Sequence, residues 1–325
     1  MSQMDVREAW QRFAAEEARG RSPIYERLAQ SVAGDPDLPA WLATLPPAKR
    51  QPNLLLAAVR LLFGTIADPG AFRSAVLDAR DRLRAVMLAR ATQTNEPGRC
   101  ATLLPVLARL QPPLALIEVG ASAGLCLLPD RYGYDFGQTV LGGPSGAPVF
   151  PCRADIVTPL PASVPEIVWR AGLDLAPVDL TDPDQRAWLE ALVWPEQTER
   201  LGRLRAAMAL AAQAPPRVVR GDLRHDLATL AAEAPRDATR VIFHTAVLAY
   251  LPSPAGREEF ARNVRAHCDI WIANEAPRVL PTVAALAPPA PQGRFLLSVN
   301  GAPVAWTDPH GAAIDWIADP AAGGR

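Results

Sequence analysis

The chain contains one lysine, Lys49, and four cysteines in 325 residues. No Cys-x-x-Cys pair occurs and no histidine stands at metal-ligand spacing, so we expect no metal site and reduced thiols in a cytoplasmic protein. The net charge of −1 gives no electrostatic reason to expect nucleic acid or an anionic membrane as partner. No apolar run has membrane-spanning length, and the charged stretch 1–20 lacks a signal-peptide core.

The composition is that of a globular protein with one large or two smaller domains, with 49% hydrophobic and 21% charged residues. Residues 1–110 show helical spacing of apolar side chains and no convincing strand. Ser22-Pro23 is typical of a helix start, and Asn53 is expected to cap a helix over 54–63. We expect a helical N-terminal cap region over 1–110, which packs on the core or covers a substrate site.

From Leu114 onward, short apolar runs alternate with helical stretches. This alternation predicts an α/β fold over 111–325, with a Rossmann-like, mostly parallel sheet and helices on both faces. The Gly- and Pro-rich segment 132–165 is expected to form an irregular or hairpin insertion. The tail after Arg294 is expected to form an antiparallel hairpin at one sheet edge. The strands are expected at 114–119, 167–173, 217–220, 240–244, 268–273 and 294–299.

The segment Leu114–Leu125 is the most informative part of the chain. An apolar run ends in an acid, and two glycines then bracket three small residues. Glycines allow a sharp turn and leave room for a ligand, and the pattern predicts a helix after the turn. Read as Glu-x-Gly-x-x-x-Gly, the segment resembles the first motif of class I S-adenosylmethionine (SAM) methyltransferases. The resemblance implies SAM as cofactor, bound by Glu118, Gly120, Ala121, Ser122 and Gly124.

The same segment also fits a second chemistry. Read as Gly-x-Ser-x-Gly, it is the nucleophile elbow of an α/β-hydrolase, with Ser122 as the nucleophile. His310, in a late Asp-Pro-His-Gly turn, lies where such an enzyme needs its general base. However, the elbow follows the first credible strand, and no upstream His-Gly-Gly run supplies an oxyanion donor. The serine hydrolase remains an alternative.

Acids also close the next two expected strands, at Asp174 and Asp222. A carboxylate at 174 can accept both hydroxyls of a ribose, and Asp222, beside Leu223, is placed to meet an adenine amino group. Glu118 suits the cationic amino group of the methionine part. Asp174 comes 56 residues after Glu118, whereas about 20 are typical of a compact dinucleotide-binding unit. The insertion must account for that difference.

The expected order of strands brings these groups together. The strand 114–119 should be central, with the strands that end at Asp174 and Asp222 on one side of it. The strand that leads to His244 and the strand after it should lie on the other side, so that strand order reverses beside Gly120. The carboxyl ends would then converge around one pocket under the N-terminal helices.

The leading hypothesis is methyl transfer from SAM to a small molecule, driven mainly by positioning of the two reactants. His244 is the candidate general base and Tyr250 the candidate lining of the acceptor pocket, although His244 is also consistent with a packed or helix-capping histidine and Tyr250 with a core residue. One alternative is a protein that binds SAM or a nucleotide without catalysis, and another is the Ser122 hydrolase. The sequence assigns neither an acceptor nor an oligomeric state.

Longer stretches of the chain resemble a bacterial family known as domain of unknown function 2332. The resemblance spans nearly the whole chain and implies one integrated unit with a fold like that of SAM methyltransferases. It implies no activity, because fold alone does not decide function. The stretches are Glu118–Gly124 with Pro129–Tyr134, Trp169–Asp179, Leu192–Glu196, His244–Pro252, Asn274–Pro277 and Asp308–Gly311.

Overall fold

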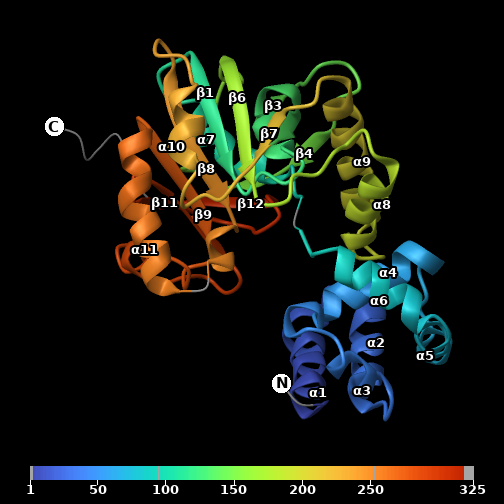
Figure 1. Ribbon diagram of the computed structural model, residues 1–325. Coiled ribbons are helices and arrows are strands. Elements are labelled where there is room, and N and C mark those ends of the chain that lie inside the picture. Colours follow the sequence, from blue (N-terminus) through green and yellow to red (C-terminus); the bar gives the residue numbers. More distant parts are fainter. Residues whose placement is uncertain (1–2, 94, 252, 318–325) are drawn as a thin grey trace. The chain divides into compact units, whose positions relative to one another are not determined.

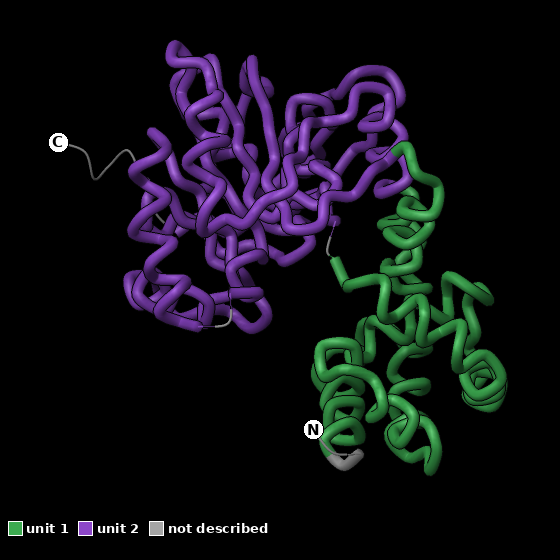
Figure 2. The backbone as a smooth tube through the Cα atoms, viewed as in Figure 1, with its two compact units in different colours: residues 1–94, 181–202 green, residues 95–180, 203–325 purple. Residues whose placement is uncertain are grey.

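The computed structural model describes residues 3–93, 95–251 and 253–317 (Figure 1). The chain forms two compact units, one of residues 1–94 and 181–202 and the other of residues 95–180 and 203–325 (Figure 2). This division assigns 95–110 to the second unit and 181–202 to the first, which the boundary expected at residue 110 does not anticipate. Within the described residues, no helix has both the length and the apolar character needed to cross a bilayer.

The first unit is helical, as the sequence predicts for this part of the chain, and its helices bury one apolar core. Ser22 caps a helix as expected, because its side chain accepts a hydrogen bond from Tyr25 N at 3.1 Å. The helices are α1 (Gln3–Arg12), the π-helix η1 (Phe13–Ala18), α2 (Pro23–Gly34), α3 (Leu38–Ala43), η2 (Pro47–Lys49), α4 (Pro52–Phe63), α5 (Pro69–Asp78), α6 (Arg80–Ala89) and α8 (Pro183–Leu192).

The expected helix cap at Asn53 is wrong. Helix α4 begins two residues earlier than expected, at Pro52, so Asn53 lies inside the first turn. Proline suits the first helical position, because its φ is already helical and its missing N–H has no partner to lose there. The Asn53 side chain instead accepts a hydrogen bond from Trp194 Nε1 at 3.1 Å, which ties α4 to the chain that follows α8.

The second unit is built on a nine-stranded sheet of order β5-β12-β11-β10-β9-β8-β1-β6-β7. Strands β7, β6, β1, β8 and β9 are parallel, whereas β9 through β12 run antiparallel to one another. The predicted central position of β1 and the order of its neighbours are confirmed. The strands are β1 (Leu114–Val119), β5 (Arg153–Ala154), β6 (Ile167–Asp174), β7 (Arg217–Arg220), β8 (Thr239–Thr245), β9 (Ile270–Glu275), β10 (Phe295–Val299), β11 (Ala302–Thr307) and β12 (Ala313–Trp316).

Strand β1 is buried along its whole length, so its two faces are covered by different layers. Ile117 and Val119 belong to an apolar core that also contains residues of α10, α11 and α12. Glu118, between them, points to the opposite face. Helix α7 lies over that face, since Arg99 at its start bonds to Thr245 of β8. The helices of this unit are α7 (Arg99–Leu107), α10 (Leu227–Ala232), α11 (Pro254–Asn263), η6 (Val264–His267) and α12 (Pro281–Ala284), while α9 (Thr198–Gln213) begins in the first unit and continues in the second from residue 203.

The insertion at 132–165 forms a second, smaller sheet. Strands β2 (Gly133–Asp135), β3 (Val140–Leu141) and β4 (Val149–Pro151) pair in the order β3-β2-β4. Strand β5 then joins the main sheet, parallel to β12 at its outer edge. The insertion and the C-terminal tail therefore pair in one sheet, in addition to the antiparallel hairpin that the sequence predicts for the tail.

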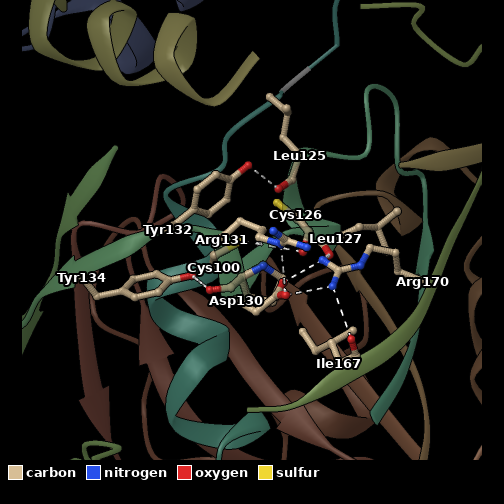
Figure 3. Close-up of polar contacts among 11 residues, drawn as sticks. Cys100, Leu125, Cys126, Leu127, Asp130, Arg131, Tyr132, Tyr134, Ile167 and Arg170 are labelled. Carbon is tan, nitrogen blue, oxygen red and sulfur yellow. Dashed lines mark hydrogen bonds and ion pairs between the residues drawn. The ribbon is translucent and has the colours of Figure 1, made fainter. Parts of the chain in front are cut away.

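No α-helix follows the glycine turn, so the expectation of a strand–turn–helix unit is wrong. Only two short 3₁₀ turns occur, η3 at Leu125–Leu127 and η4 at Pro129–Arg131. Side chains, rather than helical N–H groups, satisfy three carbonyl oxygens of this segment (Figure 3). Tyr132 Oη donates to Leu125 O (2.9 Å), Arg170 Nη1 to Leu127 O (2.9 Å) and Tyr134 Oη to Pro129 O (2.6 Å).

Arg170 also forms a two-bond ion pair with Asp130, at 2.7 and 2.9 Å (Figure 3). We expect Arg170→Met to lower the free energy of unfolding by about 2–4 kcal/mol, because it leaves a mostly buried carboxylate and a carbonyl without donors. Urea unfolding of both proteins measures the change. The matched control is Arg131→Ala, because Arg131 approaches Asp130 only to 3.5 Å and its side chain is 58% exposed; its expected effect is below about 0.5 kcal/mol. Equal losses would contradict this account.

Candidate functional site

The glycine turn after β1 is held by the acid that ends β6. Gly120, Ser122 and Gly124 all have positive φ, of 73°, 50° and 69°. The strained Ser122 backbone is fixed because its N–H donates to Asp174 Oδ2 at 2.8 Å. Ala176 N donates to the other oxygen, Asp174 Oδ1, also at 2.8 Å. The ends of β1 and β6 are therefore adjacent, as the sequence predicts, and the Asp174 carboxylate holds the glycine turn in its conformation.

Asn95 clamps the same turn from the start of the second unit. Its Nδ2 donates to Ser122 Oγ at 2.9 Å, and its Oδ1 accepts from Ala123 N at 3.1 Å. Asn95 is not among the site residues predicted from the sequence, because it lies in a region interpreted only as helical. The turn-forming run Asn-Glu-Pro-Gly at 95–98 was the available signal.

The space beside the glycines is filled by protein. A Cβ atom on Gly120 would lie 2.2 Å from Val247 Cγ2, and one on Gly124 would lie 2.7 Å from Pro216 Cγ. Glycine is thus required at both positions for close packing as well as for positive φ. The expectation that the absence of side chains here leaves room for a ligand is wrong at these two positions.

Glu118 is a buried acid with an unsatisfied oxygen. Its side chain points to the α7 face at the carboxyl end of β1, and the residue is 4% exposed. Among the described residues, Oε2 has no hydrogen-bond partner. Burial raises the pKa of Glu118 well above its usual value, with Cys126 and Asp174 adding to the shift and Arg99 opposing it. A buried carboxyl group in this condition is a strong candidate for binding a hydrogen-bond donor or a cation.

Arg99 lies on the same face and is likewise 4% exposed. Its Nε donates to Pro309 O at 2.8 Å, and its Nη1 donates to Thr245 O at 3.0 Å and Oγ1 at 3.2 Å. The guanidinium also lies over the Phe295 ring, 6.0 Å from its centroid. In the described part of the chain no carboxylate forms an ion pair with Arg99. This buried cation is not among the site residues predicted from the sequence.

A chain of uncharged polar groups continues along the α7 face. Thr245 of β8 is level with Asn274 of β9, and Asn274 Oδ1 accepts from Thr307 Oγ1 at 2.7 Å. All three residues are buried. Asn274 Nδ2 has no hydrogen-bond partner among the described residues. Together with Glu118 and Arg99, these residues make the α7 face unusually polar for the interior of a sheet protein.

His244, the candidate general base, lies on the opposite face, because it is level with Val119 rather than with Glu118. Its Nε2 accepts from Trp271 Nε1 at 3.0 Å, and its Nδ1 lies 2.8 Å from Glu275 Oε1. Because an indole N–H can only donate, Nδ1 carries the proton and donates to Glu275. Both ring nitrogens are therefore engaged within the protein, and the geometry does not favour a catalytic role.

Glu275 uses the same oxygen to hold the chain after β8. Its Oε1 accepts from Val247 N at 2.9 Å and from Leu248 N at 3.0 Å. Tyr250, farther along this segment, is 67% exposed. Desolvation of the phenol raises the pKa of Tyr250, Asp174 and Glu275 add to the shift, and Arg99 opposes it. Tyr250 is thus near these charges but is not enclosed in a formed pocket.

Asp222, predicted to meet an adenine ring, is turned toward its own loop. Its carboxylate accepts hydrogen bonds from Arg224, including Nη2 at 2.6 Å. This neighbour is the main cause that lowers the pKa of Asp222 to about 2. Leu223 beside it is partly buried against the α10–α12 core. The structure therefore brings Glu118 and Asp174 together on one face, but not Asp222 or His244.

The contacts of Ser122 do not resemble those of a hydrolase nucleophile. Its Oγ accepts a hydrogen bond from Asn95 Nδ2, whereas activation requires a base that accepts the hydroxyl proton. His244 is engaged elsewhere, and His310 is an exposed residue of the turn after β11. The helix that follows a nucleophile elbow is also absent here, because η3 and η4 take its place. Within the described residues, no group of His, Cys, Asp or Glu is arranged to hold a metal ion.

A family model described as an uncharacterized protein conserved in bacteria (DUF2332) matches residues 7–316, and the chain belongs to that family. This confirms the family resemblance of the quoted stretches. The comparison with curated proteins and the comparison with solved structures each give no match. The family description states no activity, and no homologue or structural neighbour supports the methyltransferase resemblance of the glycine segment.

The buried Glu118 generates a prediction about stability and pH. The folded protein keeps the proton at pH values where the unfolded chain, with a pKa near 4.5, has lost it, so wild-type stability falls as pH rises through this window. Glu118→Gln mimics the neutral acid and removes this dependence. Its melting temperature relative to wild type should therefore rise steadily from pH 5 to pH 8 in thermal unfolding. A difference that does not change with pH would contradict the raised pKa.

Ser122 generates a second prediction. Since Asn95 donates to Ser122 Oγ and both nitrogens of His244 are engaged elsewhere, the wild-type protein should not react with a fluorophosphonate probe, and mass spectrometry should find Ser122 unlabelled. Ser122→Ala removes one hydrogen bond to Asn95 and should lower the free energy of unfolding by about 1 kcal/mol. Stoichiometric labelling that is lost in Ser122→Ala would instead identify an activated nucleophile and restore the hydrolase hypothesis.

Proposed function

We propose that the protein binds SAM at the carboxyl end of β1 and transfers its methyl group to a small molecule. The observation that carries the proposal is Glu118, a buried acid with an unsatisfied oxygen at the place where strand order reverses. Numbered along the chain, the five parallel strands lie in the order 3-2-1-4-5, which is the order of Rossmann-like sheets. Ligands of such sheets bind beyond the carboxyl ends of the strands, beside the central one.

The groups at these strand ends match the parts of SAM unequally. Glu118 is suited to the methionine ammonium group, and Asp174, whose oxygens retain free lone pairs, to the ribose hydroxyls. Asp222 is already paired with Arg224, so adenine recognition through its carboxylate receives no support. The side chain of Val247 lies against Gly120. A ligand can therefore reach Gly120 only if the chain after β8 moves; otherwise Val247 lines the edge of the ligand site.

Methyl transfer at this site requires no protein base. SAM would supply a methyl group on a positively charged sulfur. A nucleophile with a free lone pair bonds to the methyl carbon while the carbon–sulfur bond breaks and S-adenosylhomocysteine leaves. Holding the two reactants in line can supply most of the rate enhancement. Since both nitrogens of His244 are engaged, the acceptor class that fits arrives already deprotonated at neutral pH. A carboxylate or an amine whose pKa lies below 7, such as an aromatic amine, meets this condition, whereas alkyl thiols and alkyl amines are mostly protonated at pH 7.

The same observation on His244 favours a second candidate, a protein that binds SAM or its demethylated product without catalysis. The two candidates share the binding site and differ in turnover. Incubation of the protein with SAM and a metabolite extract, followed by mass spectrometry, separates them. Tight binding without any methylated product would favour the binding protein, and a new methylated metabolite would favour the methyltransferase.

Calorimetric titration with SAM and its demethylated product tests binding itself. We expect Asp174→Ala to weaken binding by about 1.5–3 kcal/mol, the value of hydrogen bonds to a charged group, or roughly tenfold to a hundredfold in Kd. Asn95→Ala is the matched control, because it loosens the same turn without removing a ligand contact. Asp222→Ala should change Kd less than about threefold. No binding of either compound to the wild-type protein would refute the SAM proposal.

A further inference from the structure

The α7 face of the sheet buries a cation and an acid that do not bond to each other. Arg99 and Glu118 are both almost fully buried, and burial, which raises the pKa of Glu118, keeps its carboxyl group protonated while no ligand is bound. Among the described residues, Arg99 Nη2 forms no hydrogen bond, although Nε and Nη1 are fully used. Glu118 Oε2 has no partner either. Burial of a polar atom without a hydrogen-bond partner is costly, so Arg99 Nη2 and Glu118 Oε2 favour a ligand, and a bound cation would favour the charged form of Glu118.

The two groups nevertheless interact electrostatically. Arg99 is the one neighbour named above that lowers the pKa of Glu118, which places the guanidinium within electrostatic range of the carboxyl group. The other charged neighbours are committed to the protein. Asp174 accepts from the N–H groups of the glycine turn, and Glu96 accepts from Gly98 N at 3.1 Å. The unpaired Arg99 nitrogen and the unpaired Glu118 oxygen therefore remain for one ligand.

The direction of Arg99 is fixed by close backbone packing. The turn Asp308–Gly311 lies against the start of α7, where a Cβ on Gly311 would meet Gly98 O at 2.0 Å. Gly311 has φ of 85°, so both space and backbone conformation require glycine there. This packing places Pro309 O against Arg99 Nε. A guanidinium held at three acceptors loses little entropy when its last nitrogen binds a ligand.

We propose that Arg99 and Glu118 together bind the α-amino acid end of a ligand, with the guanidinium on its carboxylate and the Glu118 carboxylate on its ammonium group. An α-amino acid carries both charges on one carbon, so a single ligand can meet both groups. Guanidinium also has the donor geometry that suits a carboxylate. The inference rests in part on the proposed function, since the methionine part of SAM has such an end. Any free α-amino acid has one as well.

The test compares ligands that differ only at this end. S-adenosylhomocysteine carries the complete amino acid end, its decarboxylated analogue lacks the carboxylate, and 5′-methylthioadenosine lacks the whole group. We expect the wild-type protein to bind the complete compound about tenfold to a hundredfold more tightly than the decarboxylated one in calorimetric titration. Arg99→Met should bind these two compounds equally. Glu118→Gln should instead weaken every ligand that carries the ammonium group.

The ratio of affinities separates a contact from a structural effect, because a distorted site weakens both ligands alike. Arg224→Met is the matched control, since Arg224 is an exposed arginine paired with Asp222, and it should keep the wild-type ratio. If Arg99→Met does not fold, Arg99→Lys, which keeps the charge without the planar donors, should reduce the ratio. An unchanged ratio in folded Arg99→Met or Arg99→Lys would overturn the inference.

The same titrations distinguish failure of this inference from failure of the proposed function. If S-adenosylhomocysteine and 5′-methylthioadenosine bind wild type equally well, the adenosine part alone is recognised. The amino acid inference is then wrong, and the SAM proposal stands. If L-methionine binds through Arg99 but no adenosyl compound binds, the SAM proposal is wrong and the inference stands. If none of these compounds binds, both are wrong.

Discussion

The register of β1 against β8 decides which side chains of the second unit can act together. Glu118 is level with Phe243, and Val119 is level with His244. Since successive strand residues point to opposite faces, Glu118 and His244 are separated by the sheet itself. A shift of β8 by one residue would put both side chains on the same face, with a histidine under α7. The distribution of acid, cation and base in this protein is thus set by backbone pairing, before any side chain makes a contact.

The order of the parallel strands could be predicted from the sequence, because it depends on local patterns. Apolar runs that end in acids mark the strands, and the right-handed crossover leaves few possible orders. The missing helix after Gly124 could not be predicted in this way. The donors that replace helical hydrogen bonds there come partly from Arg170, which lies 43 residues beyond Leu127. Local propensity was overruled by tertiary partners that no short window of sequence contains.

The candidate site was only partly predictable for the same reason. Glu118 and Asp174 were identified because an acid at a strand end is visible in the sequence. Arg99 was missed because its partners Thr245 and Pro309 are 146 and 210 residues away. His244 was selected by its position at a strand end. Its engagement depends on Trp271 and Glu275, which come 27 and 31 residues later. The position of a residue along a strand can be predicted from the nearby sequence, whereas the hydrogen-bond partners of a histidine ring nitrogen cannot.

The pairing of β5 with β12 has a consequence for biosynthesis. Residues 153–154 meet residues 313–314, so the outer sheet edge cannot close until the ribosome has passed the codon for Trp316. A nascent chain that has reached Glu275 but not Phe295 presents β9 as an open edge, a conformation prone to join strands of other chains. It also lacks the Pro309 carbonyl that orients Arg99. The speed of translation through this last stretch therefore bears on how much of the newly made protein escapes aggregation.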